Sequence, residues 1–199
     1  MPTDLLPRLI SVDRAVTRRI AYGLPHPGWF VRPLSVLSTS ANHGVLWFVL
    51  AALPMLRRRP GGGRRFVYVS GAVLAAEVAN YGVKLLVKRP RPVPEEADET
   101  LITAPKTSSF PSSHAAMAVA ATATARRLSP RLAGPCATLG AVLCASRPYL
   151  RVHYAGDVAV GLLVGRLVTS VYTRLVRAPA GKTGALAAAL PASSGSDAS

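Results

Sequence analysis

The sequence is poor in charged residues and poorest in acidic ones. Only 17% of its 199 residues are charged, 50% are hydrophobic, and the mean hydropathy is +0.30. These values exclude an ordinary soluble domain of this size and indicate an integral membrane protein. The length allows one domain or one compact bundle of helices.

The shortage of acids leaves 24 lysine and arginine residues against 9 aspartate and glutamate residues, a formal net charge of +15. So large a positive charge raises the question of nucleic-acid binding. The basic residues, however, fall mainly at the ends of apolar runs, where membrane proteins keep them. No basic, aromatic-rich soluble module is left over, so we expect no nucleic-acid partner.

Cysteine is scarce, and two further features are missing. Cys136 and Cys144 share one apolar run and lie roughly 12 Å apart along a helix, too far for a disulfide. The first twenty residues contain several charges and no apolar core of a signal peptide. No carboxylate–histidine cluster has the spacing of metal ligands, so we expect no metal and no other cofactor.

What the chain does contain is a series of helical segments. Residues 4–22 set apolar residues among arginine and aspartate, which predicts an amphipathic helix in the membrane interface. Residues 28–42 predict a short, half-buried helix. More apolar helices are predicted at 43–56, 66–87, 113–128, 131–147 and 155–176. The expected fold class is an all-α integral membrane bundle of five to six helices with an amphipathic N-terminal interfacial helix.

These segments suggest three parts. Residues 1–42 form the N-terminal interfacial segment, and residues 43–177 form the helical bundle. Residues 178–199, rich in alanine, glycine and serine, form a disordered tail. Within the bundle, Glu77 and Arg166 are charged residues to which the sequence assigns no firm role.

The basic residues also suggest an orientation in the membrane. The turns at 57–65 and 126–131 lie on one side, which the positive-inside rule makes cytoplasmic. The acidic loop 88–111 and the stretch 146–154 then face the extracytoplasmic side. Five crossings leave the N-terminal helix outside, unless residues 28–42 supply a sixth crossing. The sequence leaves both options open.

The stretch from Ser146 to Asp157 carries the first candidate site. Asp157 follows His153 at i+4, so its carboxylate can reach back to the imidazole. A carboxylate on one ring nitrogen fixes the tautomer and leaves the other nitrogen free to attack. Arg147 can hold a phosphate in front of that nitrogen. Taken alone, such a pair is more often a structural hydrogen bond.

Two other stretches place cations and a second histidine at helix ends on the same predicted side. Lys84 and Arg91 can bind a phosphate, although they could equally snorkel to anionic lipid. Ser112 and Ser113 begin a helix whose free N–H groups and dipole favour an anion, although helix capping alone would explain them. His114 in the first turn can protonate a leaving oxygen.

The coincidence of all three stretches on one predicted side favours catalysis over separate structural roles. The arrangement suits phosphoryl transfer in two steps, in which His153, oriented by Asp157, attacks phosphorus and His114 protonates the leaving group. Water then hydrolyses the phosphohistidine, with His114 acting as base. The phosphate oxygens would be bound by Lys84, Arg91, Ser112, Ser113 and Arg147.

These residues resemble the three signature motifs of the type 2 phosphatidic acid phosphatase family. The motifs are Lys-x6-Arg-Pro at Lys84, Arg91 and Pro92, Pro-Ser-x-His at Pro111, Ser112 and His114, and Ser-Arg-x5-His-x3-Asp at Ser146, Arg147, His153 and Asp157. The resemblance covers residues 66 to 176, and the chain departs from it at Ser113, where the family usually has glycine. It implies a helical membrane bundle, a metal-independent phosphatase and a lipid substrate. It also implies the nucleophile role of His153 and the acid role of His114.

The sequence therefore predicts a membrane enzyme that hydrolyses a lipid phosphate monoester or a polyprenyl diphosphate at the outer leaflet. The alternative is a non-catalytic bundle that binds or transports lipid phosphates, but binding does not require two histidines and an orienting aspartate. The substrate stays open among phosphatidic acid, phosphatidylglycerol phosphate, undecaprenyl diphosphate and phosphorylated decaprenyl-sugar lipids. The oligomeric state stays open as well.

Overall fold

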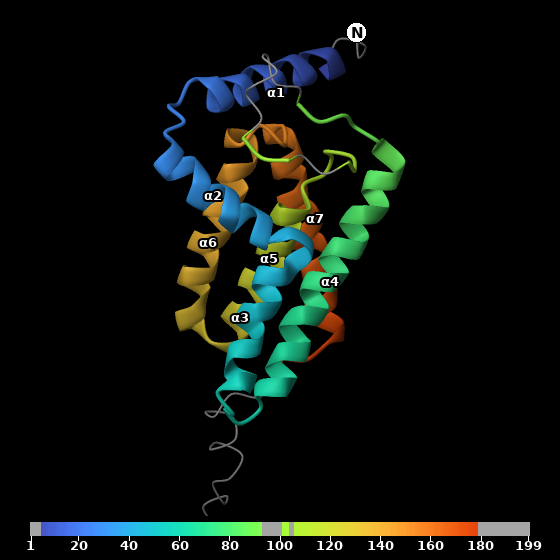
Figure 1. Ribbon diagram of the computed structural model, residues 1–199. Helices are drawn as coiled ribbons and strands as arrows, with labels where there is room; N and C mark the ends of the chain where they lie inside the picture. Colours follow the sequence, from blue (N-terminus) through green and yellow to red (C-terminus); the bar gives the residue numbers. More distant parts are fainter. Residues whose placement is uncertain (1–4, 93–100, 104–105, 179–199) are drawn as a thin grey trace, which may run out of the picture.

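The computed structural model describes residues 5–92, 101–103 and 106–178, and all the regular secondary structure in these ranges is helical. The elements are α1 (Leu5–Tyr22), α2 (Gly28–Ser40), the 3-10 turn η1 (Asn42–Gly44), α3 (Val45–Leu56), α4 (Gly62–Val87), α5 (Ser113–Leu128), α6 (Pro130–Tyr149) and α7 (Ala155–Leu175). In Figure 1, α2 to α7 form an elongated bundle, and α1 lies across one end of it. The predicted all-α membrane bundle with a separate N-terminal helix is confirmed.

Helix α5 lies at the centre of the bundle and packs against α4, α6 and α7. Its buried face is built mainly of alanine, which lets neighbouring helices approach closely. Two glycines of α7 make the closest approach. A Cβ at Gly161 would lie 2.4 Å from the carbonyl oxygen of Ser112, and one at Gly165 would lie 2.5 Å from that of Ala116. These contacts fix the start of α5 against α7.

We expect Gly165→Ala to lower the stability of the bundle, because the new methyl group would push α7 away from α5. Overpacking of this kind costs about 1–3 kcal/mol. The measurement is thermal unfolding of the purified protein in detergent. Gly82→Ala in α4 is the matched control, since a Cβ there meets nothing within 4 Å. Equal melting temperatures for the two variants would contradict the tight α5–α7 contact.

A bend joins α2 to α3. The two helices meet at 59°, and the break contains two left-handed residues, His43 (φ 52°) and Gly44 (φ 80°). Gly44 is required there, because a Cβ would also lie 2.9 Å from Cγ1 of Val73. Figure 1 shows α2 and α3 continuing in one direction along the bundle. Residues 28–42 therefore run with α3 as one bent pair along the bundle, which has the form of a broken span or of a re-entrant loop.

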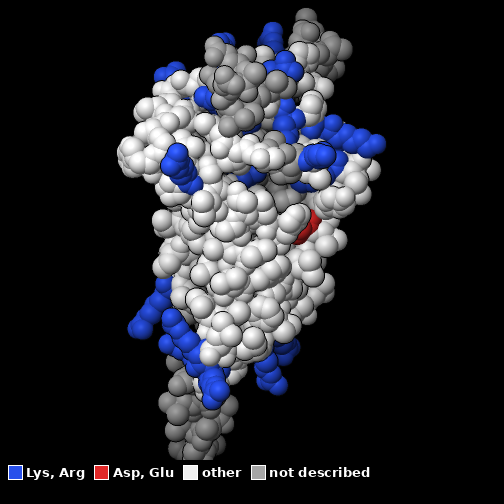
Figure 2. Space-filling view, viewed as in Figure 1, with Lys and Arg blue, Asp and Glu red and all other residues white. Residues whose placement is uncertain are grey.

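Charged side chains are concentrated at the two ends of the bundle. Figure 2 shows basic residues at both ends and a largely uncharged band between them. By length and composition, α4 and α7 are apolar enough to cross a membrane, and the bent pair of α2 and α3 is a third candidate. Two predicted features lie outside the described residues. They are the acidic part of the loop after α4 (residues 95, 96, 98 and 99) and nearly all of the predicted tail (179–199).

Candidate active site

His153 and Asp157 form the predicted pair. His153 lies in the short connection between α6 and α7, and Asp157 lies in the first turn of α7. Both are buried, with exposures of 2% and 0%. Nδ1 of His153 is 3.4 Å from Oδ2 of Asp157, which is longer than a full hydrogen bond. The same oxygen accepts the N–H of Tyr154 at 2.9 Å, which fixes the carboxylate at the start of α7.

The other ring nitrogen of His153 faces Arg91. Nη1 of Arg91 is 3.2 Å from Nε2 and also donates to the carbonyl of Val152 at 2.7 Å. Since a guanidinium can only donate, Nε2 presents its lone pair and Nδ1 carries the proton toward Asp157. Burial lowers the pKa of His153 to about 3, with the positive charges of Arg147 and Arg91 acting in the same direction and Asp157 opposing them. The imidazole is therefore neutral at physiological pH, as a nucleophile must be.

His114 and Arg147 meet at a residue of α2. Nε2 of His114, in the first turn of α5, donates to the carbonyl of Ser38 at 3.0 Å. Arg147, in the last turn of α6, is 2% exposed and donates from Nη1 to the hydroxyl of Ser38. Lys84, Arg147 and His153 all lie within electrostatic range of His114. The second histidine and the buried cation thus belong to the same cluster as the first pair.

The two serines at the start of α5 differ in their hydrogen bonds. The N–H of Ser112 donates to the carbonyl of Asp157 at 2.9 Å, but its buried hydroxyl has no partner among the described residues. The hydroxyl of Ser113 accepts instead from Asn80 of α4 at 3.0 Å, and Asn80 also donates to the carbonyl of Pro111 at 3.1 Å. Because Asn80 holds the side chain of Ser113, this serine can replace the glycine usual in the motif.

The cations of the first motif line an open pocket. Nζ of Lys84 donates to the carbonyl of Ser108 at 2.8 Å, and Nε of Arg91 donates to that of Thr107 at 3.2 Å. A cavity of about 500 Å³ is lined by Lys84 and Arg91, and a second of about 250 Å³ is lined by Arg147. Both volumes are large enough for a phosphate group, so the cations are accessible to an anion.

The structure therefore brings all the sequence-predicted site residues to the end of the bundle covered by α1 (Figure 1). They come from the end of α4, the segment after it, the start of α5, the end of α6, the connection after α6 and the start of α7: Lys84, Arg91, Ser112, Ser113, His114, Arg147, His153 and Asp157. Within the described ranges, no group of three or more His, Cys, Asp and Glu residues is placed to hold a metal ion.

Sequence reasoning missed three residues of this site. Ser38 joins His114 to Arg147, as described above. Arg89 donates from Nη1 to Oδ1 of Asp157 at 2.8 Å and from Nη2 to Oδ2 of Asp13, in α1, at 2.7 Å. Asp13 carried a signal, since acids are rare in this chain and Asp13 stands four residues before Thr17 on one helix face.

Comparisons with known proteins agree with this geometry. The family model described as the PAP2 superfamily matches residues 65–179. A curated relative, the decaprenylphosphoryl-5-phosphoribose phosphatase of Mycobacterium tuberculosis, is 33% identical over 168 residues, which are 80% of this chain and 81% of the relative.

Two solved structures share the fold. The transmembrane PAP2-type phosphatidylglycerolphosphate phosphatase from Bacillus subtilis superposes with a TM-score of 0.63 at 21% identity, covering 85% of this chain and 89% of its own. Aquifex aeolicus LpxE superposes with a TM-score of 0.65 at 23% identity, covering 82% of this chain and 95% of its own. The site motifs, the family match and the shared fold all lead to one conclusion: the chain belongs to the PAP2 superfamily and is a membrane phosphatase.

Proposed function

We propose that this phosphatase hydrolyses a phosphate monoester on a polyprenyl-linked sugar lipid at the extracytoplasmic face, through a phosphohistidine at His153. The observation that carries the mechanism is the state of His153, whose Nε2 lone pair faces Arg91 and whose Nδ1 faces Asp157. The substrate class is supported by the relative named as a decaprenylphosphoryl-5-phosphoribose phosphatase, whose similarity spans 80% of the chain.

In the proposed first step, Nε2 of His153 forms a bond to phosphorus as the bond to the sugar oxygen breaks. The guanidinium of Arg91 moves from Nε2 to the phosphate oxygens, where Lys84 and Arg147 also neutralise charge. His114, protonated on both ring nitrogens once the phosphate dianion is bound, gives its Nε2 proton to the leaving oxygen and becomes neutral, and the carbonyl of Ser38 holds that nitrogen in place beforehand. In the second step, His114 takes a proton from water, which attacks phosphorus and releases His153 and inorganic phosphate.

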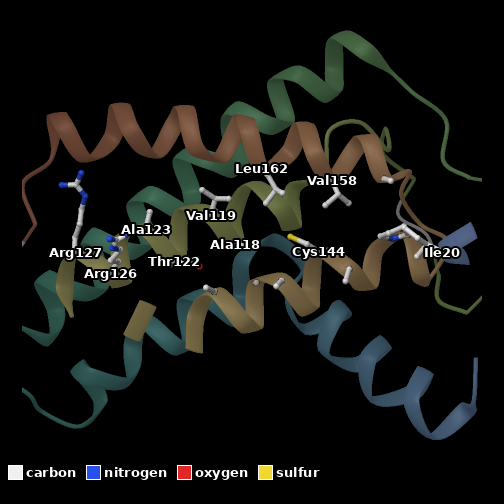
Figure 3. Close-up of a pocket in the computed structure, with 16 residues that line it drawn as sticks. Ile20, Ala118, Val119, Thr122, Ala123, Arg126, Arg127, Cys144, Val158 and Leu162 are labelled. Carbon is white, nitrogen blue, oxygen red and sulfur yellow. The ribbon is translucent and has the colours of Figure 1, made fainter. Parts of the chain in front are cut away.

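The lipid tail has a suitable place beside the site. A cavity of about 1060 Å³ runs between α5, α6 and α7 (Figure 3). Helices α6 and α7 both pack on α5 but have few contacts with each other. The end of the cavity nearest the site includes Pro148 and Ala155, and Pro148 directly follows Arg147. Beyond this end, the cavity is lined mainly by small or apolar side chains, including Ala118, Val119, Ala141, Val158 and Leu162. An isoprenoid chain in this cavity would keep its phosphorylated head at the cations.

We expect Ala141→Phe to raise the KM for a long-chain polyprenyl substrate about tenfold, because the ring would fill part of this cavity. A water-soluble aryl phosphate has no tail, so its KM should change less than twofold. Val142→Phe is the matched control, since Val142 is the next residue of α6, is 42% exposed and does not line the cavity. The measurement is steady-state phosphate release in detergent. Equal effects of Ala141→Phe on both substrates would rule out the cavity as the tail site.

The proposed function is tested by phosphate release from a panel of lipids in detergent with EDTA present. We expect the phosphorylated polyprenyl sugar to give the highest kcat/KM, above phosphatidic acid, phosphatidylglycerol phosphate and undecaprenyl diphosphate. His153→Ala supplies the inactive blank. If the wild type and this variant release equally little phosphate from every lipid, the catalytic proposal is wrong. If another lipid is the best substrate, the polyprenyl-sugar assignment is wrong while the mechanism stands.

A further inference from the structure

We propose that α1 and the turn after it position the nucleophile of the proposed reaction. Four residues of this region, Asp13, Thr17, Ala21 and Pro25, contact the segment 149–157 that carries His153. We call these four residues the α1 clamp. They lie outside residues 65–179, the part of the chain that the family model matches. The inference therefore concerns a part of the catalytic apparatus that the three motifs do not contain.

Two side chains of the clamp cap the start of α7. Oδ1 of Asp13 accepts the N–H of Gly156 at 2.7 Å, and the hydroxyl of Thr17 accepts the N–H of Ala155 at 2.9 Å. The first N–H groups of a helix have no partner within the helix, and side-chain oxygens usually satisfy them from the preceding residue. Here the oxygens come from a distant helix. Asp157 lies in the same first turn, so its position is tied to α1.

Two backbone carbonyls of the clamp bind residues that precede His153 in the chain. Nε of Arg151 donates to the carbonyl of Ala21 at 3.3 Å, and the hydroxyl of Tyr149 donates to that of Pro25 at 2.7 Å. The ring of His26 stacks on that of Tyr149 with the centroids 4.2 Å apart. Clamp contacts therefore occur both before and after His153 in the chain, which restrains the connection between α6 and α7.

Asp13 also acts through charge. Arg89 is shared between Asp13 and Asp157, with N–O distances of 2.7 and 2.8 Å. Burial alone would lower the pKa of Arg89, but its two carboxylate partners raise it above the ordinary value. Without Asp13, the whole charge of Arg89 would fall on Asp157 and reduce the negative potential at His153. Asp13 thus leaves Asp157 able to orient the imidazole and to stabilise the positive charge that develops on it.

A second face of α1, about 110° around the helix from the clamp residues, has a different role. Leu5, Leu9, Val12 and Val16 are 64%, 57%, 59% and 44% exposed and lie on one side of the helix. An exposed apolar stripe of this kind fits a helix in the membrane interface. One face of α1 can therefore rest in the lipid surface while the other holds the catalytic segment.

The first test is Asp13→Asn, assayed on the lipid of the panel above that gives the wild type its highest kcat/KM. Asparagine keeps an oxygen for the N–H of Gly156 but loses the ion pair with Arg89. We expect kcat to fall about tenfold, as for the loss of one charge-assisted hydrogen bond, with KM changed less than twofold. Arg14→Gln is the matched control, because it also removes one charge from α1 and Arg14 is exposed. This variant should retain the wild-type kcat.

The second test asks whether Asp13 acts through Arg89. Arg89→Gln should lower kcat by itself, and adding Asp13→Asn to it should cause less than a twofold further loss. A purely structural role of Asp13 would instead give additive losses. Thr17→Val, which removes only a cap of α7, should lower kcat less than Asp13→Asn does.

A third measurement does not depend on turnover. In protein labelled with 15N-histidine, the ring signals of His153 should shift in Asp13→Asn and stay unchanged in Arg14→Gln. If the wild type is inactive, the proposed function fails, but this measurement still decides the role of α1. The α1 proposal is overturned if the wild type is active and Asp13→Asn matches Arg14→Gln in kcat. It is equally overturned if the His153 signals do not respond to the loss of Asp13.

Discussion

Replacing His153 by glutamine is expected to reduce phosphate release by at least about four orders of magnitude, because the proposed mechanism assigns the covalent intermediate to the ring of this residue. Nε2 of His153 is the ring nitrogen that presents a lone pair toward the cations, and burial keeps the ring neutral. Glutamine has a similar size and polarity but is not a nucleophile. The loss should therefore fall on kcat, and the affinity for a phosphorylated lipid should change little. Initial rates of phosphate release in detergent measure the effect.

A trapping experiment separates this role from simple phosphate binding. A lipid carrying 32P in the phosphate group, followed by an alkaline quench, should label the wild type on histidine and leave His153→Gln unlabelled. His43→Gln is the matched control, because the side chain of His43 is 89% exposed and its Nδ1 is 3.9 Å from a carboxylate oxygen of Glu77, which is not a site residue. That variant should keep wild-type activity and label. Labelled protein after the His153→Gln change would show that a different residue is the nucleophile.

The catalytic motifs were predictable because their chemistry depends on residue types at fixed spacings. Asp157 at i+4 from His153, and the serines ahead of His114 at a helix start, imply their geometry before any tertiary contact is known. The motifs lie at the ends of predicted helices on one side of the bundle, so the sequence also predicts that the fold brings them together. Helix α4 begins at Gly62, earlier than the predicted 66, because the basic residues after the glycine turn belong to its first turn.

The missed features depend on contacts between distant helices. Ser38 binds His114 through a backbone carbonyl, an atom that every residue has and that no sequence pattern marks. The sequence did not predict that residues 28–42 join α3 in one bent pair. The break at His43 and Gly44 interrupts the helical period, and Pro33 lies inside α2. Arg89 stands between two cations assigned to phosphate, so only its distance to Asp13 and Asp157 shows a different role.

Asp157→Asn is expected to lower kcat by about three orders of magnitude or more, close to the roughly 10⁴-fold loss for the same change in a serine protease triad. The carboxylate of Asp157 faces three groups with N–H protons: Arg89 at Oδ1, and the Tyr154 N–H and His153 Nδ1 at Oδ2. An amide has one acceptor oxygen, so either Arg89 or the pair of groups at Oδ2 must face an NH2 group instead.

If the NH2 group faces His153, Nδ1 becomes the acceptor and the proton moves to Nε2, the nitrogen that must attack. If it faces Arg89, a partly buried cation loses a partner and moves away from α7. Arg89→Gln tests that second case alone, because it removes the cation that binds Oδ1 and leaves the carboxylate of Asp157 intact. A kcat for Asp157→Asn that is no lower than that for Arg89→Gln would mean that the carboxylate does not set the tautomer. A much lower kcat, together with a 15N spectrum that shows the proton of His153 on Nε2, would assign the loss to the wrong tautomer of the nucleophile.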